Sequence, residues 1–156
     1  MIMHSTRTQH QRQFTADILR LARIYRREVN RCLSQHGLSD ARAIPVLHIA
    51  RSGDGMRQGV LAEELGLEGP SLVRLLDQLC AAGLVQRRDD PKDRRAKTLH
   101  ITDEGRALAT VLEEVLHKLR SQLLIQVSDE DLAATIRTLN AFEAALDAAE
   151  ASAKGG

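Results

Sequence analysis

The sequence predicts a mainly α-helical protein that carries one small β-hairpin. Leucine and alanine dominate its apolar positions, whereas Trp is absent and only Phe14, Phe142 and Tyr25 are aromatic. Apolar residues recur at helical spacing through most of the 156 residues. Only after Gly83 does the period shorten to the alternation of strands.

The chain begins with two segments of different character. Residues 1–13 are polar and lack an apolar stripe, so they are predicted to form a flexible tail. A long helix is expected within residues 14–38, because apolar side chains then return every three or four positions. Shorter helices are expected over residues 41–51 and 58–65, the latter closed by Gly66.

The next helix has clearly marked ends. Pro70 suits the first helical position, and Gly83 suits a left-handed C-terminal cap. Leucines at helical spacing form one apolar stripe, and polar residues occupy the other side. The stripe is Leu72, Leu75, Leu76 and Leu79, and the polar side is Ser71, Arg74, Asp77 and Gln78. Together with the short helix before it and the Gly-containing turn, this half-buried helix predicts a helix-turn-helix.

Two strands are expected at residues 84–88 and 97–102, around a charged, turn-rich segment at residues 89–96. They form a hairpin with a projecting tip, which predicts a winged helix-turn-helix domain over residues 39–102. The net charge of +1 carries no information about nucleic acid, but its distribution does. Residues 87–97 contain three acidic residues and six basic ones, which are Arg87, Arg88, Lys92, Arg94, Arg95 and Lys97.

Two long helices are expected over residues 103–151, before a frayed end at residues 152–156. Thr102 caps the first, and Ser128 with Asp131 has the spacing of a capping box that opens the second. These helices and residues 14–38 carry more apolar surface than a small winged domain can cover. A homodimer is therefore predicted, the alternative being that the helices pack only within one chain.

Several classes of function are excluded by what the sequence lacks. Cys32 and Cys80 stand alone without the spacing of metal ligands, so neither metal nor cofactor is expected. No paired-carboxylate, nucleophile or phosphate-loop pattern is visible, so an enzyme is not expected. With neither a signal peptide nor a membrane span, the protein is expected in the cytoplasm.

Three stretches taken together resemble the MarR family of bacterial regulators, most closely its SlyA branch. They are Gly66 to Leu79, Gly83 to Arg87, and Asp93-Arg-Arg-Ala-Lys-Thr-Leu-His-Ile-Thr102. The resemblance implies an obligate dimer of two winged helix-turn-helix lobes on a shared helical base. It also implies binding to palindromic operators in double-stranded DNA, usually as a repressor and often relieved by small aromatic acids.

The predicted DNA-binding residues divide between helix and wing. Arg74 can bind guanine bidentately or clamp a phosphate, while the alternative is a solvated helix face. Arg94 or Arg95 could enter a narrow minor groove, and the resemblance favours Arg95, with Arg94 and Lys97 on the backbone. Asp93 is expected to support the wing. The full DNA-binding set is Pro70, Ser71, Arg74, Gln78, Arg94, Arg95 and Lys97.

A ligand site is implied where the first two helices meet the DNA-binding lobe. The candidates to hold an aromatic carboxylate there are Arg23, Tyr25, Arg26, His48 and Arg51. Arg23 and His48 fall at positions that resemble ligand contacts of the SlyA branch. The alternative is that the arginines form surface ion pairs and the histidine is structural.

Two other functions compete with this interpretation. A thiol-based redox sensor of the same fold would use Cys32 or Cys80, but relatives that sense peroxides carry the cysteine near the start of the first helix. A winged helix that binds only protein is the other alternative, and the basic wing together with Arg74 argues against it.

Overall fold

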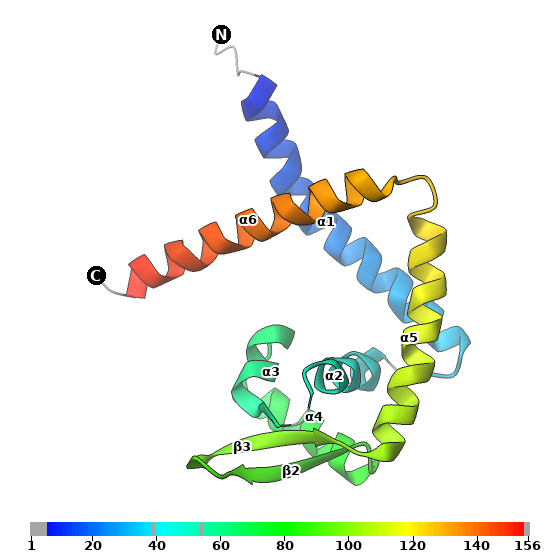
Figure 1. Cartoon of the computed structure of the whole chain (residues 1–156), viewed down its shortest axis with the longest axis vertical. Helices are drawn as coiled ribbons and strands as arrows, with labels where there is room; N and C mark the ends of the chain where they lie inside the picture. The colour runs from blue at the N-terminus through cyan, green and yellow to red at the C-terminus, as the bar shows by residue number, and fades with distance from the viewer. Residues whose placement is uncertain (1–5, 39, 54, 155–156) are drawn as a thin grey trace. The chain divides into compact units, whose positions relative to one another are not determined.

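The computed structural model describes residues 6–38, 40–53 and 55–154 of the chain. They form two compact units, one ending at Leu119 and the other starting at Arg120. Helices dominate both, and the first also contains one small sheet (Figure 1), which confirms the predicted fold class. The elements are α1 (Thr6–Gln35), α2 (Asp40–Arg51), β1 (Met56–Arg57), α3 (Gln58–Leu65), α4 (Gly69–Ala81), β2 (Val85–Asp90), β3 (Asp93–Ile101), α5 (Asp103–Leu123) and α6 (Asp129–Lys154).

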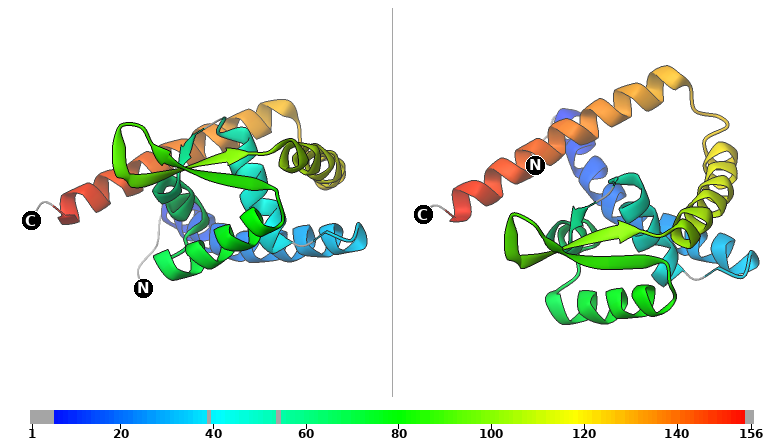
Figure 2. Two further views of the ribbon diagram at one scale, coloured as in Figure 1. Left: turned by 90° about the horizontal axis from the view of Figure 1, so that it is seen from below. Right: turned by 60° about the horizontal axis from the view of Figure 1, so that its bottom comes forward.

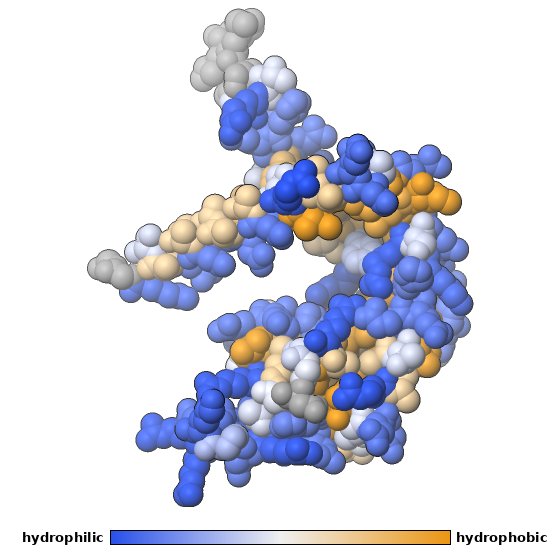
Figure 3. Space-filling view, viewed as in Figure 1, coloured by the Kyte–Doolittle hydropathy of each residue, from blue (hydrophilic) through white to orange (hydrophobic). Residues whose placement is uncertain are grey.

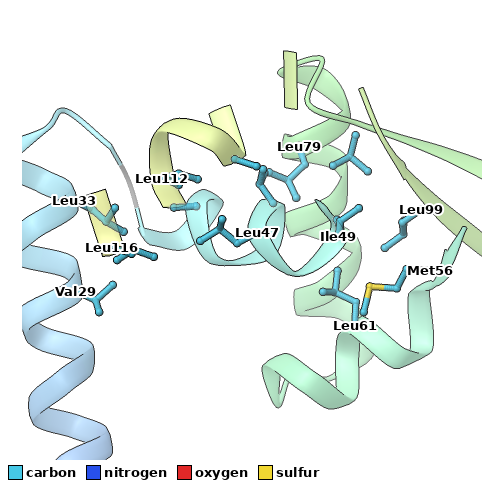
Figure 4. Close-up of a cluster of buried hydrophobic side chains, with 14 of the residues drawn as sticks. Val29, Leu33, Leu47, Ile49, Met56, Leu61, Leu79, Leu99, Leu112 and Leu116 are labelled. Atoms are coloured by element: carbon cyan, nitrogen blue, oxygen red, sulfur yellow. The ribbon is translucent and has the colours of Figure 1, made fainter. Parts of the chain in front are cut away.

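One aliphatic core holds the first unit together, and every element from α1 to α5 contributes to it. Figure 4 shows part of this cluster, with Leu33 of α1, Leu47 of α2 and Leu112 of α5 among its labelled side chains. All three are at most 2% exposed. Because burying such a side chain contributes about 1.5–3 kcal/mol, this core fixes α1 and α5 against the winged lobe.

The sheet has three antiparallel strands in the order β1-β3-β2. The predicted hairpin is confirmed, but its strands run further toward the tip than expected. Pairing runs from Val85↔Ile101 to Asp89↔Lys97 and, after an irregularity, to Asp90↔Asp93, so the segment predicted as a charged turn is mostly strand. The two-residue strand β1, where Met56 pairs with Leu99, was missed because its pairing is entirely non-local.

Two predicted terminal boundaries are corrected. The prediction of a flexible tail over residues 1–13 is wrong for residues 6–13, because α1 begins at Thr6 rather than Phe14. Polar residues such as Gln and Arg are good helix formers even without an apolar stripe. The predicted fraying over residues 152–156 is wrong for residues 152–154, because the Ala-rich α6 continues to Lys154. Residues 1–5 and 155–156 lie outside the described residues.

The predicted helix caps are confirmed. The Thr102 Oγ1 atom accepts the Gly105 N–H at 3.0 Å, at the start of α5. The Ser128 hydroxyl accepts the Asp131 N–H at 3.1 Å and donates to the Asp131 carboxylate at 2.9 Å. Gly83 has φ +71°, the left-handed conformation that favours glycine. Local chemistry therefore sets the points at which α4 ends and α5 and α6 begin.

Candidate nucleic-acid interface

Helix α4 presents a polar side to solvent, as its sequence predicts. Leu72, Leu76 and Leu79 are almost completely buried, whereas Leu75 is only partly covered. Pro70 lies in the first turn, where its missing N–H leaves no helical hydrogen bond unmade. The remaining predicted DNA contacts of the helix, Ser71, Arg74 and Gln78, are exposed.

The wing lies beside this helix. The β2–β3 hairpin and α4 occupy the same end of the first unit (Figures 1 and 2). Arg87 of β2 forms an ion pair with Asp77 of α4, which links the two elements at the surface. Within the described part of the chain, the Arg74 side chain has neither an ion pair nor a hydrogen bond. Arg74 is therefore the cation of α4 that is free to bind an external anion.

The wing contains both paired and unpaired cations. Lys97 pairs with Asp89 on the opposite strand. Arg94 and Arg95 are exposed, and neither has an acidic partner among the residues that the structure describes. The surface over the hairpin is strongly hydrophilic (Figure 3). Of the three predicted wing cations, Lys97 is thus the one already bound to a carboxylate.

Asp90 anchors the wing, and sequence reasoning missed it. It is only 6% exposed and accepts hydrogen bonds from Arg57 Nε at 2.9 Å and from the Lys92 N–H at 2.8 Å. The Lys92 N–H and the Arg57 guanidinium hold the pKa of the Asp90 carboxyl below its ordinary value. Asp93, the predicted support, accepts the Arg95 N–H at 3.0 Å. Asp90 before Pro91 has the pattern of an Asx turn, which could have revealed it.

A large pocket lies where α1 and α2 meet α4. Its volume is about 830 Å³, within the range of small-molecule sites. Tyr25 and Arg26 line it, as predicted, together with Asn30 from α1. The apolar lining is Ala22, Val29, Ala41, Ile44, Pro45, Leu65, Leu67, Pro70 and Leu75, and Ser71, Arg74 and Gln78 of α4 complete it.

The structure does not bring the other predicted ligand residues to this pocket. Arg23 is exposed on α1 and is not part of the lining. His48 lies between α2 and α3, with Nδ1 2.7 Å from Glu64 Oε2. Arg51 donates from Nε to Glu113 of α5 at 2.6 Å. For Arg51 and His48, these contacts match the alternative in which the arginine forms a surface ion pair and the histidine is structural.

Other kinds of site are not found in the described residues. No group of three or more His, Cys, Asp or Glu side chains that could hold a metal ion occurs among them. Cys32 and Cys80 are both free thiols that are partly buried. None of the described helices combines the length and apolarity that crossing a bilayer requires.

Comparison with known proteins agrees with the geometry of helix and wing. Residues 36–96 match the model of the MarR family. The transcriptional regulator PA3341 is 36% identical, with a TM-score of 0.78, and the match covers 86% of this chain and 98% of that one. MepR from S. aureus in a complex with DNA is similar in fold: it is 21% identical with a TM-score of 0.65, and the match covers 80% of this chain and 95% of that one. CouR from Rhodococcus jostii RHA1 bound to p-coumaroyl-CoA is also similar in fold: it is 23% identical with a TM-score of 0.68, and the match covers 80% of this chain and 87% of that one.

The fold and the two exposed elements define a winged helix-turn-helix protein. The 36% identity over nearly all of a solved transcriptional regulator, with the match of residues 36–96, identifies its family. The chain belongs to the MarR family of DNA-binding transcriptional regulators.

Proposed function

We propose that the chain acts as a homodimer that binds a palindromic operator and represses transcription until an aromatic carboxylate releases it. One observation carries the DNA-binding part of the proposal. An exposed arginine on α4 and two on the adjacent wing have no acidic partner in the described chain. MepR, a protein of the same fold, has been solved in a complex with DNA, which supports DNA binding by this fold.

Each element has a distinct role in this proposal. Arg74 of α4 reads guanine or clamps a phosphate in the major groove, with Gln78 as a second contact. Ser71 lies near the helix N-terminus, where backbone N–H groups favour a phosphate. Arg95 enters the minor groove and Arg94 contacts the backbone. Lys97 must exchange Asp89 for a phosphate, so we expect it to contribute less than the unpaired arginines.

A second copy of the chain is the partner that best covers the exposed apolar side chains. On α1, Leu19 is 71% exposed, and after α5 Ile125 is 76% exposed. Helix α6 contains no buried residue, and apolar side chains such as Ile136 face solvent in the single chain. Apolar surface is visible around α6 (Figure 3). The exposed apolar side chains of α1, of the segment after α5 and of α6 favour an interface with a second copy over a solvated surface.

The pocket supports the proposed effector. It combines a mostly apolar lining with Arg26 and with Tyr25, whose ring could stack on an aromatic ligand. CouR, which shares the fold, is bound to an aromatic acyl thioester. We therefore centre the effector site on Tyr25 and Arg26. The wing sequence from Asp93 to Lys97 supports the SlyA-like branch as the nearest group.

Selection of bound fragments from genomic DNA tests the function directly. The full-length protein should enrich inverted repeats with half-sites about 34–36 Å apart, one turn of DNA. Binding to a selected operator is then measured against salt. Arg95→Ala should reduce the slope of log K against log[salt] by about 2, because each dimer loses two cations whose binding releases counterions from the DNA.

Arg27→Ala is the matched control for this experiment. Arg27 is an exposed arginine of α1 that does not line the pocket, so its removal should leave the salt slope unchanged. Failure to enrich any sequence would refute operator binding. An unchanged slope in Arg95→Ala would refute the role of the wing alone.

A further inference from the structure

The effector pocket and the proposed DNA-reading face share residues. Ser71, Arg74 and Gln78 line the pocket, and the same three side chains form the exposed polar side of α4. Their spacing puts them on neighbouring turns of one side of the helix. The helix that would enter the major groove is therefore also one wall of the ligand site.

The charge of the pocket favours an anion. Arg26 and Arg74 are the charged residues in the described lining, and no Asp or Glu occurs there. Arg26 comes from α1 and Arg74 from α4, so an anionic group held by both would connect the two walls. No other described residue competes for the Arg74 guanidinium.

The size of the pocket narrows the class of ligand. At about 830 Å³ it lies near the upper end of the range for small-molecule sites. A single-ring acid would leave much of the apolar lining uncovered. An amphipathic anion with two or more rings, or with one ring and an extended chain, fits the volume and the lining better.

We propose, on the basis of the proposed function, that an amphipathic anion bound in the pocket releases the protein from its operator. It does so by competing directly with the DNA for the Arg74 guanidinium. An Arg74 guanidinium that holds the effector inside the pocket is no longer available for bidentate binding to a guanine or phosphate of the operator. Effector and operator then exclude each other within one lobe. This differs from a change in spacing between the two lobes, which permits both ligands on one dimer with a finite coupling, typically about 5–150-fold.

The test uses 2-naphthoate, a two-ring carboxylate, as the probe. Isothermal titration measures its affinity for the free full-length dimer and for the dimer saturated with the selected operator. The proposal expects binding to the free dimer and none to the operator complex. In anisotropy titrations, the apparent operator Kd should keep rising with the concentration of free 2-naphthoate and should not reach a plateau. A plateau, or equal binding to the operator complex, would overturn direct competition.

Three variants locate the shared residue. Arg74→Ala should weaken 2-naphthoate binding roughly tenfold or more, because a charge-assisted hydrogen bond is lost, and should also weaken operator binding. Arg95→Ala should weaken operator binding alone, since Arg95 lies outside the pocket lining. Arg27→Ala, on α1 and also outside the lining, should change neither affinity. Normal 2-naphthoate affinity in Arg74→Ala would overturn the assignment.

The outcomes separate this inference from the function on which it rests. If 2-naphthoate fails to bind the free dimer, both the effector site and the competition are refuted, while operator binding stands. If 2-naphthoate binds the free dimer and the operator complex equally, only the competition is refuted. Circular dichroism of Arg74→Ala distinguishes loss of a contact from loss of the fold.

Discussion

Replacing Gly105 by alanine should destabilise the protein, although alanine is the better helix former. Gly105 lies in the first turn of α5, where a Cβ atom would come 2.1 Å from the backbone oxygen of Leu84 and 2.7 Å from Ile101 Cδ1. The Leu84 oxygen already accepts the Thr102 N–H at 3.1 Å. It belongs to the backbone, so the clash cannot be relieved by a change of rotamer.

The magnitude follows from the shift required. To reach an acceptable contact, the start of α5 would have to withdraw by roughly 1 Å from the sheet in a close-packed interior. Overpacking of this kind costs about 1–3 kcal/mol, occasionally more. Better helix propensity would return up to about 1 kcal/mol. We expect a net loss of about 1–2 kcal/mol in the free energy of unfolding.

Urea denaturation at fixed protein concentration measures this loss, because the stability of a dimer depends on concentration. Gly59→Ala in α3 is the matched control. Gly59 is exposed and no described atom lies within 4 Å of its added Cβ, so the variant should gain up to about 1 kcal/mol. Equal or greater stability of Gly105→Ala would show that α5 can move freely on the sheet, and would refute the reasoning.

Three further changes test other parts of the structure. Asp90→Asn removes a carboxylate whose pKa is lowered in the folded protein. The stabilisation that this carboxylate gives to the wing is therefore complete above the ordinary pKa of Asp, and it is lost as pH falls through the lowered pKa. The variant should bind operator more weakly at neutral pH and show faster hydrogen exchange in the wing; equal values would contradict the anchor. Ile136→Glu should shift the dimer toward monomer in sedimentation, whereas Val60→Glu on α3 should not; an intact dimer would exclude this face. Thr102→Ala should lower the free energy of unfolding by about 1 kcal/mol by removing the α5 cap, and an unchanged urea midpoint would argue against it.

Features set by neighbouring residues could be predicted from the sequence. The leucine stripe of α4, its Gly83 cap and the Thr102 cap of α5 each depend on a few residues within about one or two helical turns. The hairpin also followed, since alternation marks β3 over Leu99 and Ile101. These are the elements in which local propensity and tertiary packing agree.

The features that could not be predicted from the sequence depend on residues that are distant from one another along the chain. Met56 is in a strand because it pairs with Leu99, and Asp90 is an anchor because Arg57 reaches it from β1. The pocket brings residues of α1 and α2 against α4, so no single segment carries its pattern. For the same reason, His48 could not be seen to contact Glu64 across α2 and α3 rather than the pocket.

The pairing of charges makes the salt dependence of operator binding a final test of the interface. The cations of α4 and the hairpin fall into two groups. Arg87 and Lys97 are neutralised by carboxylates, whereas five have no acidic partner in the described chain: Arg74, Arg88, Lys92, Arg94 and Arg95.

If only the unpaired cations contact phosphates, a dimer makes at most ten such contacts, and the slope of log K against log[salt] is at most about −9. If the two paired cations also exchange their carboxylates for phosphates, the limit moves to about −13. A measured slope steeper than about −9 would therefore show that the ion pairs open on binding. A shallower slope, unchanged in Lys97→Ala, would mean that Asp77 and Asp89 keep Arg87 and Lys97 from contacting phosphates. A chain of net charge +1 would then bind DNA through a limited set of arginines and one lysine.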